Sequence, residues 1–169
     1  MASAAVPKGA LDNAIKFLDG AGTPDELPVT LRAGAFKWVD AQTSYEVLHD
    51  RQAISGVIPN QDQPGTWEFS AHVAELTNGS ADNLLDWLRR QGSFNARVST
   101  GTGAFARATT YYFSIEITGE VSNHDTGNTD NVTTLLLCLP DEIKWSDEAA
   151  NVLEVKGRFY GGYTVTGTS

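Results

Sequence analysis

Three residue types in this 169-residue chain could point to specific chemistry, namely histidine, cysteine and paired carboxylates. The three histidines, His49, His72 and His124, fall in separate segments and lack the i, i+4 spacing or cysteine partners of a metal site. The single cysteine, Cys138, lies in the apolar run TLLLCLP, where it cannot form an internal disulfide and fits a small buried hydrophobe. We therefore expect no metal, no cofactor and a reduced compartment.

Two motifs are similar to ligand-binding loops, but the sequence around each does not fit such a loop. The segment SNHDTGNTDN, 122–131, is rich in oxygen ligands, yet it lacks EF-hand spacing and a closing Glu and joins two expected strands. GTGAFA, 101–106, matches the glycine spacing of a dinucleotide fingerprint, but a β-patterned stretch follows it where a helix is needed. Both are better explained as loops, and we predict that the protein is not an enzyme.

Carboxylates mark the polar face of the clearest strand pattern. In YYFSIEITGEV, 111–121, apolar residues alternate with a polar set that includes Glu116 and Glu120. No pocket signal flanks this pair, so a solvated acidic face is favoured over acid–base catalysis.

The charge balance argues against a protein that grips nucleic acid. Asp and Glu total 21 against 12 Lys and Arg, giving a net charge of −9, and residues 110–169 hold nine acids and three bases. Such a surface repels phosphate, although nucleic acid could pass it without sticking. No apolar run is long enough to span a bilayer and no secretory signal is visible, so we expect a soluble protein without membrane contact.

The remaining patterns predict a mainly β, antiparallel sandwich or barrel of eight or nine strands. Period-2 alternation marks TWEFSAHVAEL and VLEVKGRFYGGYTV, and turn signals occur at Pro59-Asn60, Pro64-Gly65 and Pro140-Asp141. Shorter strands are expected at 13–18, 28–38, 43–49, 53–58, 94–100, 104–110 and 131–139. We expect a single domain spanning 1–169, with a flexible N-terminus at about 1–12 and a long hairpin arm at about 40–65.

One short helix interrupts this pattern. TNGSADNLLDWLRRQGS predicts a helix at about 81–91, capped by Ser80 and stopped by Gly92. We expect it to flank the sandwich at a sheet edge or open end. The residues expected to pack it there are Leu84, Leu85, Trp87 and Leu88.

The succession NAIKFLDGAGTPDELPVTL, ISGVIPNQDQPGTWEFSAHVAELT, SADNLLDWLRRQG and TYYFSIEITGEV resembles the tail tube proteins of long-tailed bacteriophages, over about residues 13–166. The resemblance implies a β-sandwich with a flanking helix, in rings that are typically hexameric and stack into a hollow tube through which the genome leaves the capsid. It also implies that the arm at about 40–65 reaches the next ring.

The same resemblance implies partners and a location. The partners would be other copies of the chain, the tape measure, terminator and tail-tip proteins, and double-stranded DNA only in passage. The location would be the virion tail, after synthesis in the host cytoplasm. Glu116 and Glu120, with Glu68 behind them, are candidates for the lumen wall, and keeping the surface soluble is the alternative role for these carboxylates.

Two other function classes remain open. One is a carbohydrate- or receptor-binding β-sandwich that uses exposed aromatic residues and the loop 122–131. The other is a different virion part, such as a tail terminator, baseplate or decoration protein, because fold alone does not separate these roles.

Overall fold

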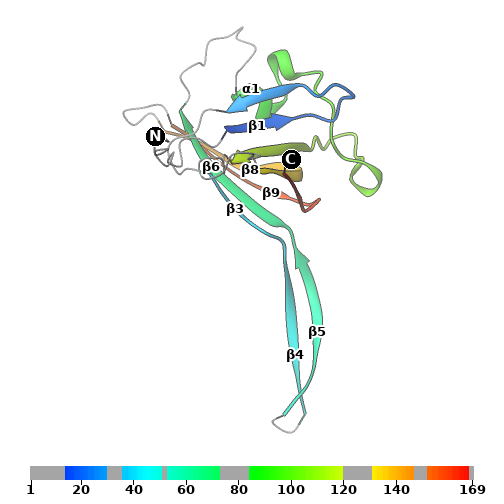
Figure 1. Cartoon of the computed structure of the whole chain (residues 1–169). Coiled ribbons are helices and arrows are strands. Elements are labelled where there is room, and N and C mark those ends of the chain that lie inside the picture. Colours follow the sequence, from blue (N-terminus) through cyan, green and yellow to red (C-terminus); the bar gives the residue numbers. More distant parts are fainter. Residues whose placement is uncertain are drawn as a thin grey trace, which may run out of the picture.

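The computed structural model describes residues 14–29, 36–50, 53–72, 84–119, 131–146 and 152–167. These residues form antiparallel strands and one short α-helix, which confirms the predicted fold class. The strands are β1 (Ala14–Leu18), β2 (Glu26–Val29), β3 (Lys37–Val39), β4 (Gln42–Asp50), β5 (Ala53–Gln63), β6 (Gly65–His72), β7 (Phe113–Gly119), β8 (Asn131–Ser146), β9 (Val152–Phe159) and β10 (Tyr163–Gly167). The helix is α1 (Leu84–Arg89), and single 3₁₀ turns occupy Gly92–Phe94 and Gly103–Phe105 (Figure 1).

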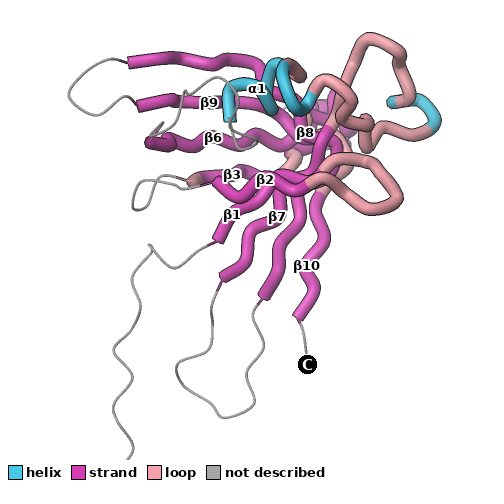
Figure 2. Tube along the Cα trace, turned by 90° about the horizontal axis from the view of Figure 1, so that it is seen from above, coloured by secondary structure: helices cyan, strands magenta, loops and turns pink. Residues whose placement is uncertain are grey.

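Strand β8 belongs to two layers of the structure. Its first half pairs with β7 on one edge and β10 on the other, and its second half pairs with β9. Between the two halves the strand bulges, with Leu137 at a positive φ of 55° and Leu136 bonded to the β9–β10 turn at Gly161 and Gly162. The bulge bends β8, so that the strands of the first layer, β2-β1-β7-β8-β10, run in a different direction from β8-β9-β6-β3 (Figure 2).

Aromatic side chains lock the two layers together. The Phe17 ring of β1 lies 5.8 Å from that of Phe69 in β6, and the Trp67 ring of β6 lies 6.0 Å from Phe113 in β7. All four are at most 2% exposed, and each contributes roughly 1.5–3 kcal/mol or more through burial. The rest of the core comes from residues of β1, β2, β7, β8 and β9, including Ile15, Leu27, Ile115, Leu135, Leu153, Val155 and Phe159.

Two of the expected strands are wrong. Residues 94–100 and 104–110 form the ends of 3₁₀ turns and irregular loop, and the turns begin at Gly92 and Gly103, which adopt positive φ values of 56° and 57°. In the first segment Phe94 is the anchor, buried against Trp87 with ring centroids 4.8 Å apart, whereas Val98 is 48% exposed. One buried side chain is enough to hold such a loop on the body, so the loop does not need to pair as a strand.

Prolines that were expected to mark turns lie inside strands, so some predicted strand boundaries are wrong. The turn expected at Pro140-Asp141 is absent, because β8 continues to Ser146 and absorbs the proline at a register shift opposite β9. Pro59 likewise lies inside β5, whose only partner within the described residues is β4, so a missing N–H on its other edge costs nothing. The strand expected at 28–38 is divided between β2 and β3, which belong to different layers.

The helix ends two residues earlier than expected. Arg90, with a φ of 53°, takes the left-handed position assigned to Gly92, and the backbone bonds Arg90 N to Trp87 O and Gln91 N to Asp86 O close the last turn. A non-glycine residue is held there because the Arg90 guanidinium lies 3.5 Å above the Tyr111 ring and its Nε donates to Arg97 O. Ser80 and residues 81–83 lie outside the described residues.

We predict that Gly157→Ala lowers the free energy of unfolding by about 2 kcal/mol or more. A Cβ on Gly157 would overlap both the Trp67 ring and Leu139 O, and overpacking of this kind typically costs about 1–3 kcal/mol. Gly22→Ala is the matched control, because a Cβ there meets nothing within 4 Å. Urea denaturation of both variants checks this, and equal stability would contradict the close packing of β9 on Trp67.

Candidate functional site

The described residues that could act in catalysis or metal binding do not come together in one site. Within the described part of the chain, no three His, Cys, Asp or Glu side chains are placed to hold a metal ion. His49 is exposed on β4, whereas His124 and the loop 122–130 lie outside the described residues. Cys138 is fully buried, and this burial raises the pKa of its thiol. Among the described helices, none is long and apolar enough to cross a membrane.

The described aromatic residues divide between exposed and buried positions, and the exposed ones include Tyr45, Trp145 and Tyr163, at 64%, 42% and 41%. Trp67 and Tyr112 are buried, and Tyr111 lies under the Arg90 guanidinium. Tyr160 is 38% exposed but contacts Tyr112, with ring centroids 6.2 Å apart. These side chains therefore serve the core and the loop next to it, rather than a sugar-stacking surface.

The helix packs mainly through Trp87, one of the four residues expected to hold it against the sandwich. Trp87 is fully buried and lies 6.2 Å from the Phe17 ring, and Leu88 is 7% exposed. Leu84 is partly buried against the core, and Leu85 is also half-buried. Helix α1 thus lies beside β2 and fills the space between the layers with an indole ring.

A buried arginine holds this helix region on the sheet. The Arg97 guanidinium lies between the rings of Trp87 and Phe113, at 4.7 and 5.2 Å from their centroids, and is 3% exposed. Its Nε and Nη1 are buried without a hydrogen-bond partner. Desolvation lowers the pKa of Arg97 to about 10, and Asp19 opposes this shift. Because the unfolded chain binds this proton more tightly, the cost of burying the charge is present in full below about pH 10.

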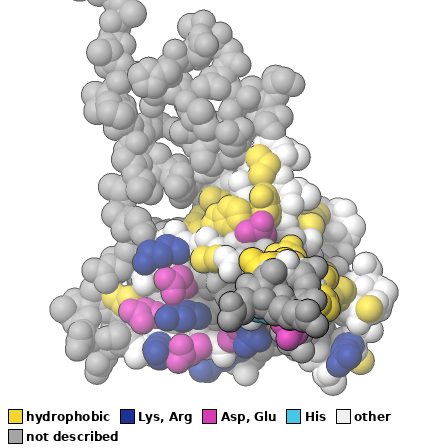
Figure 3. Space-filling view, turned by 90° about the horizontal axis from the view of Figure 1, so that it is seen from below, with side chains coloured by type: hydrophobic (Ala, Val, Ile, Leu, Met, Phe, Trp, Pro, Cys, Tyr) yellow, Lys and Arg dark blue, Asp and Glu magenta, His cyan; other side chains and the backbone are white. Residues whose placement is uncertain are grey.

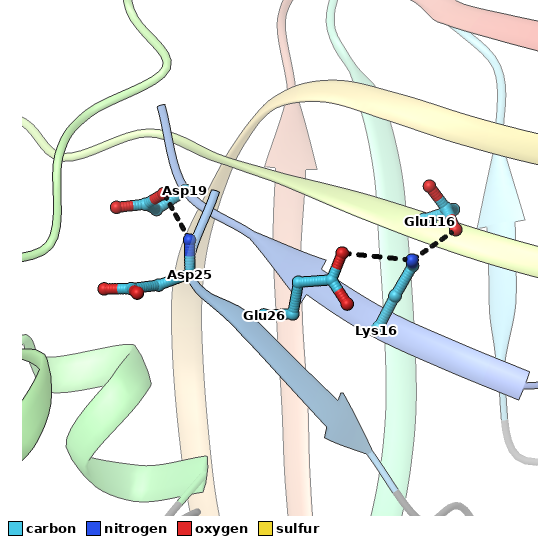
Figure 4. Close-up of polar contacts among 5 residues, drawn as sticks. All are labelled: Lys16, Asp19, Asp25, Glu26 and Glu116. Carbon is cyan, nitrogen blue, oxygen red and sulfur yellow. Dashed lines mark hydrogen bonds and ion pairs between the residues drawn. The ribbon is translucent and has the colours of Figure 1, made fainter. Parts of the chain in front are cut away.

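The Asp19 carboxylate is fully engaged in hydrogen bonds with backbone N–H groups near Arg97. It accepts hydrogen bonds from the N–H groups of Ala21, Asp25 and Val98 at 2.9–3.0 Å. The bond to Asp25, drawn in Figure 4, closes the β1–β2 turn, and the bond to Val98 fastens the loop that follows Arg97. Asp19 therefore has a structural role: its three backbone hydrogen bonds hold the β1–β2 turn and the loop after Arg97 together.

We expect Arg97→Met to keep or raise the free energy of unfolding, because an apolar chain of similar length fills the site without a poorly paired charge. Arg97→Ala should instead cost about 2–4 kcal/mol through the cavity between Trp87 and Phe113. Urea denaturation followed by tryptophan fluorescence distinguishes the two. Equal losses for Met and Ala would show that the guanidinium itself stabilises the protein.

Glu116 lies on the outer face of the β2-β1-β7-β8-β10 layer, where Lys16 partly neutralises it. Lys16 Nζ lies 3.1 Å from Glu116 and 3.3 Å from Glu26 (Figure 4). The hydrogen bond to Glu116, reinforced by Glu26, raises the pKa of Lys16 against a smaller desolvation effect. The three residues carry a net charge of −1, so this face is only weakly acidic. Glu120 lies outside the described residues.

Glu68 lies on the outer face of the other layer, within a set of alternating charges. Its carboxylate is 3.6 Å from Lys37 and 3.5 Å from Lys156, its neighbours on β3 and β9. Figure 3 shows acidic and basic side chains interspersed on one part of the surface. We call this set the charge lattice; its members are Lys37, Glu68, Asp141, Glu142, Lys144, Glu154, Lys156 and Arg158. Glu68 and Glu116 therefore lie on outer faces of different layers.

The remaining surface feature is the arm, formed by β4 and β5. These strands pair only with each other in the described structure and project from the body (Figure 1). Directly opposed residues share a face, so the register Val47↔Val57 and His49↔Ile54 places Tyr45, Val47, Val57 and Ile54 on one side of the arm. These four side chains are 44–68% exposed.

Comparison with solved structures identifies this fold. Over 96% of this chain and 93% of the other, it superposes with a TM-score of 0.59 and 11% identity on a chain from an extracellular contractile injection system, the PVC sheath–tube complex in its extended state. A chain from the PVC sheath/tube terminator gives 0.56 at 10% identity, covering 99% and 100%. A chain from the anti-feeding prophage baseplate gives 0.54 at 13% identity, covering 99% and 98%.

Scans of protein-family models and of curated proteins find no match to the sequence. The likeness is therefore one of fold, and it extends over nearly the whole length of both chains. The protein shares its fold with chains in structures of a sheath–tube complex, a sheath/tube terminator and a prophage baseplate.

Proposed function

We propose that this protein is a structural, non-catalytic subunit that assembles with copies of itself into stacked rings. The rings, hexameric in this proposal, form the hollow tube of a bacteriophage tail or a related injection machine. The observation that carries the proposal is the arm, a folded ribbon with exposed apolar side chains on both faces, Leu48 and Ile58 lying on the face opposite Val47 and Val57. The fold likeness to tube and terminator chains supports it.

The arm needs a partner on physical grounds. A two-stranded ribbon alone is marginally stable in water, and this one exposes Tyr45, Val47, Val57 and Ile54 on a single face. Contiguous apolar surface that projects from a soluble body marks an interaction site. A second copy is the natural occupant, because stacking identical rings supplies one partner for every arm.

The sheet edges support contacts within a ring. Within the described residues, β2 and β3 end the strand order, and β10 pairs only with β8. Edge strands present unpaired N–H and C=O groups, which are a liability in a monomer and a ready interface in a ring. Pairing such edges between neighbouring copies would satisfy them and close the ring.

The tube role is preferred to that of a terminator because an arm that leaves the body allows stacking to continue. In either role the partners are other tail proteins, including tape-measure, tip and terminator proteins, and sheath where one is present. The net charge of −9 gives the chain as a whole no attraction for double-stranded DNA. The protein would then act in the virion tail or in a comparable particle.

We expect purified protein at high concentration to form rings or hollow tubes in negative-stain electron microscopy. Tyr45→Ser/Ile54→Ser should leave the body folded, because both residues are exposed, and should abolish stacking. Size-exclusion chromatography and circular dichroism of the same samples check both points.

Val98→Ser, which changes a valine that is 48% exposed outside the arm, is the control and should leave assembly intact. Wild-type protein that stays monomeric at every concentration and salt, and is stabilised by a glycan or receptor fragment, would support a binding module instead. Single rings that never stack would point to a terminator.

A further inference from the structure

We infer that the outer face of the β8-β9-β6-β3 layer is the wall of the channel, and that its balanced charges keep it non-adhesive to polyanions and polycations alike. The inference rests on the proposed tube and goes beyond it by assigning one face and its electrostatic character. Four bases and four acids make up the charge lattice on this face, so its formal net charge is zero.

Strand register places six of the eight lattice charges opposite a charge of the other sign, and a side-chain ion pair joins the remaining two, Asp141 and Arg158. Along one row, Lys37, Glu68, Lys156 and Glu142 lie directly opposite one another on β3, β6, β9 and β8 and alternate in sign. In the next row Lys144 pairs with Glu154. Beside them, Arg158 Nε donates to Asp141 at 2.7 Å, and Lys144 lies 3.2 Å from Glu142.

This pairing determines how the face acts on passing molecules. A protein binds nucleic acid chiefly when its cations replace the counterions of the phosphates, and here carboxylates already neutralise the cations. Alternating charges cancel beyond roughly the strand spacing of about 5 Å, well within the Debye length of about 8 Å at physiological salt. The face therefore neither attracts nor repels a passing polyanion or polycation strongly.

The outer face of the other layer differs in kind. Its described charges are Lys16, Glu26 and Glu116, and the rest of it is largely threonine with the half-buried Leu18 and Val132. Such a face has fewer solvated groups and more surface that a neighbouring protein could cover. We therefore assign it to the outside of the tube.

The assignment is tested by placing a heavy-atom label on each face. Lys156→Cys introduces a thiol on the lattice and Thr164→Cys introduces one at an exposed position of the other outer face, while the buried Cys138 stays unreactive. Tubes labelled with a maleimide gold cluster should show gold inside the channel for Lys156→Cys and outside for Thr164→Cys by cryo-electron microscopy.

Glu154→Cys, also on the lattice, provides a second variant should Lys156→Cys not assemble. Gold outside the tube for lattice variants would overturn the assignment and leave the tube itself intact. If wild-type protein forms no tubes, the proposed function fails first and this inference with it.

Oligonucleotide binding tests separately whether the balanced charges make the face non-adhesive. Glu68→Gln/Glu142→Gln/Glu154→Gln leaves the lattice with four bases and Asp141, a net charge of +3. Variant tubes should bind a fluorescent single-stranded oligonucleotide of about 20 nucleotides at least about 10-fold more tightly than wild type at low salt, and the gain should vanish as salt rises.

Glu26→Gln/Glu116→Gln, on the opposite face, is the matched control and should change binding far less, because it leaves a net charge of only +1 there. Wild-type tubes that bind the oligonucleotide as tightly as the lattice variant would contradict a non-adhesive wall. Binding equal for the lattice variant and the control would contradict the assignment of the lattice to the channel.

Discussion

The bend in β8 is the constraint on which the rest of the structure depends. A single strand pairs with β7 and β10 before the bend and with β9 after it, so the two layers are continuous and their inner faces must meet. The bend requires Leu137 to adopt a left-handed conformation, which costs about 1–2 kcal/mol for a residue with a side chain. Burial of Phe17, Phe69, Trp67 and Phe113 between the layers more than offsets that cost.

On the outer faces of the two layers of the body, described carboxylates lie next to lysine side chains. Lys16 lies between Glu26 and Glu116, and Lys37 and Lys156 flank Glu68. Exposed pairs of this kind contribute little stability individually, typically 0–1 kcal/mol. Their effect is on the field that the surface projects, because register places opposite charges side by side. A count of charges along the sequence misses this cancellation.

The fold class could be predicted because strong alternation survives into the structure. The pattern in TWEFSAHV and YYFSIEIT corresponds to β6 and β7, whose alternate residues form the core. The loop at 94–110 could not be predicted by the same rule, since Phe94 is an anchor and no strand pairs with that segment. Register was also out of reach: nothing local in the sequence shows that Glu68 faces two lysines while Glu116 faces one, on a different layer.

The junction between arm and body determines how the arm can move. Val39 pairs with Thr66 in the body and Gln42 with Gln63 in the arm, and the ladder is interrupted between these pairs, where Pro64 has no N–H to donate. Gly65 follows it, pressed against the Phe159 ring, so the body side of the junction is fixed. The step between the two ladders is therefore the place where the angle between arm and body can change without breaking a pair within β4–β5 or β3–β6.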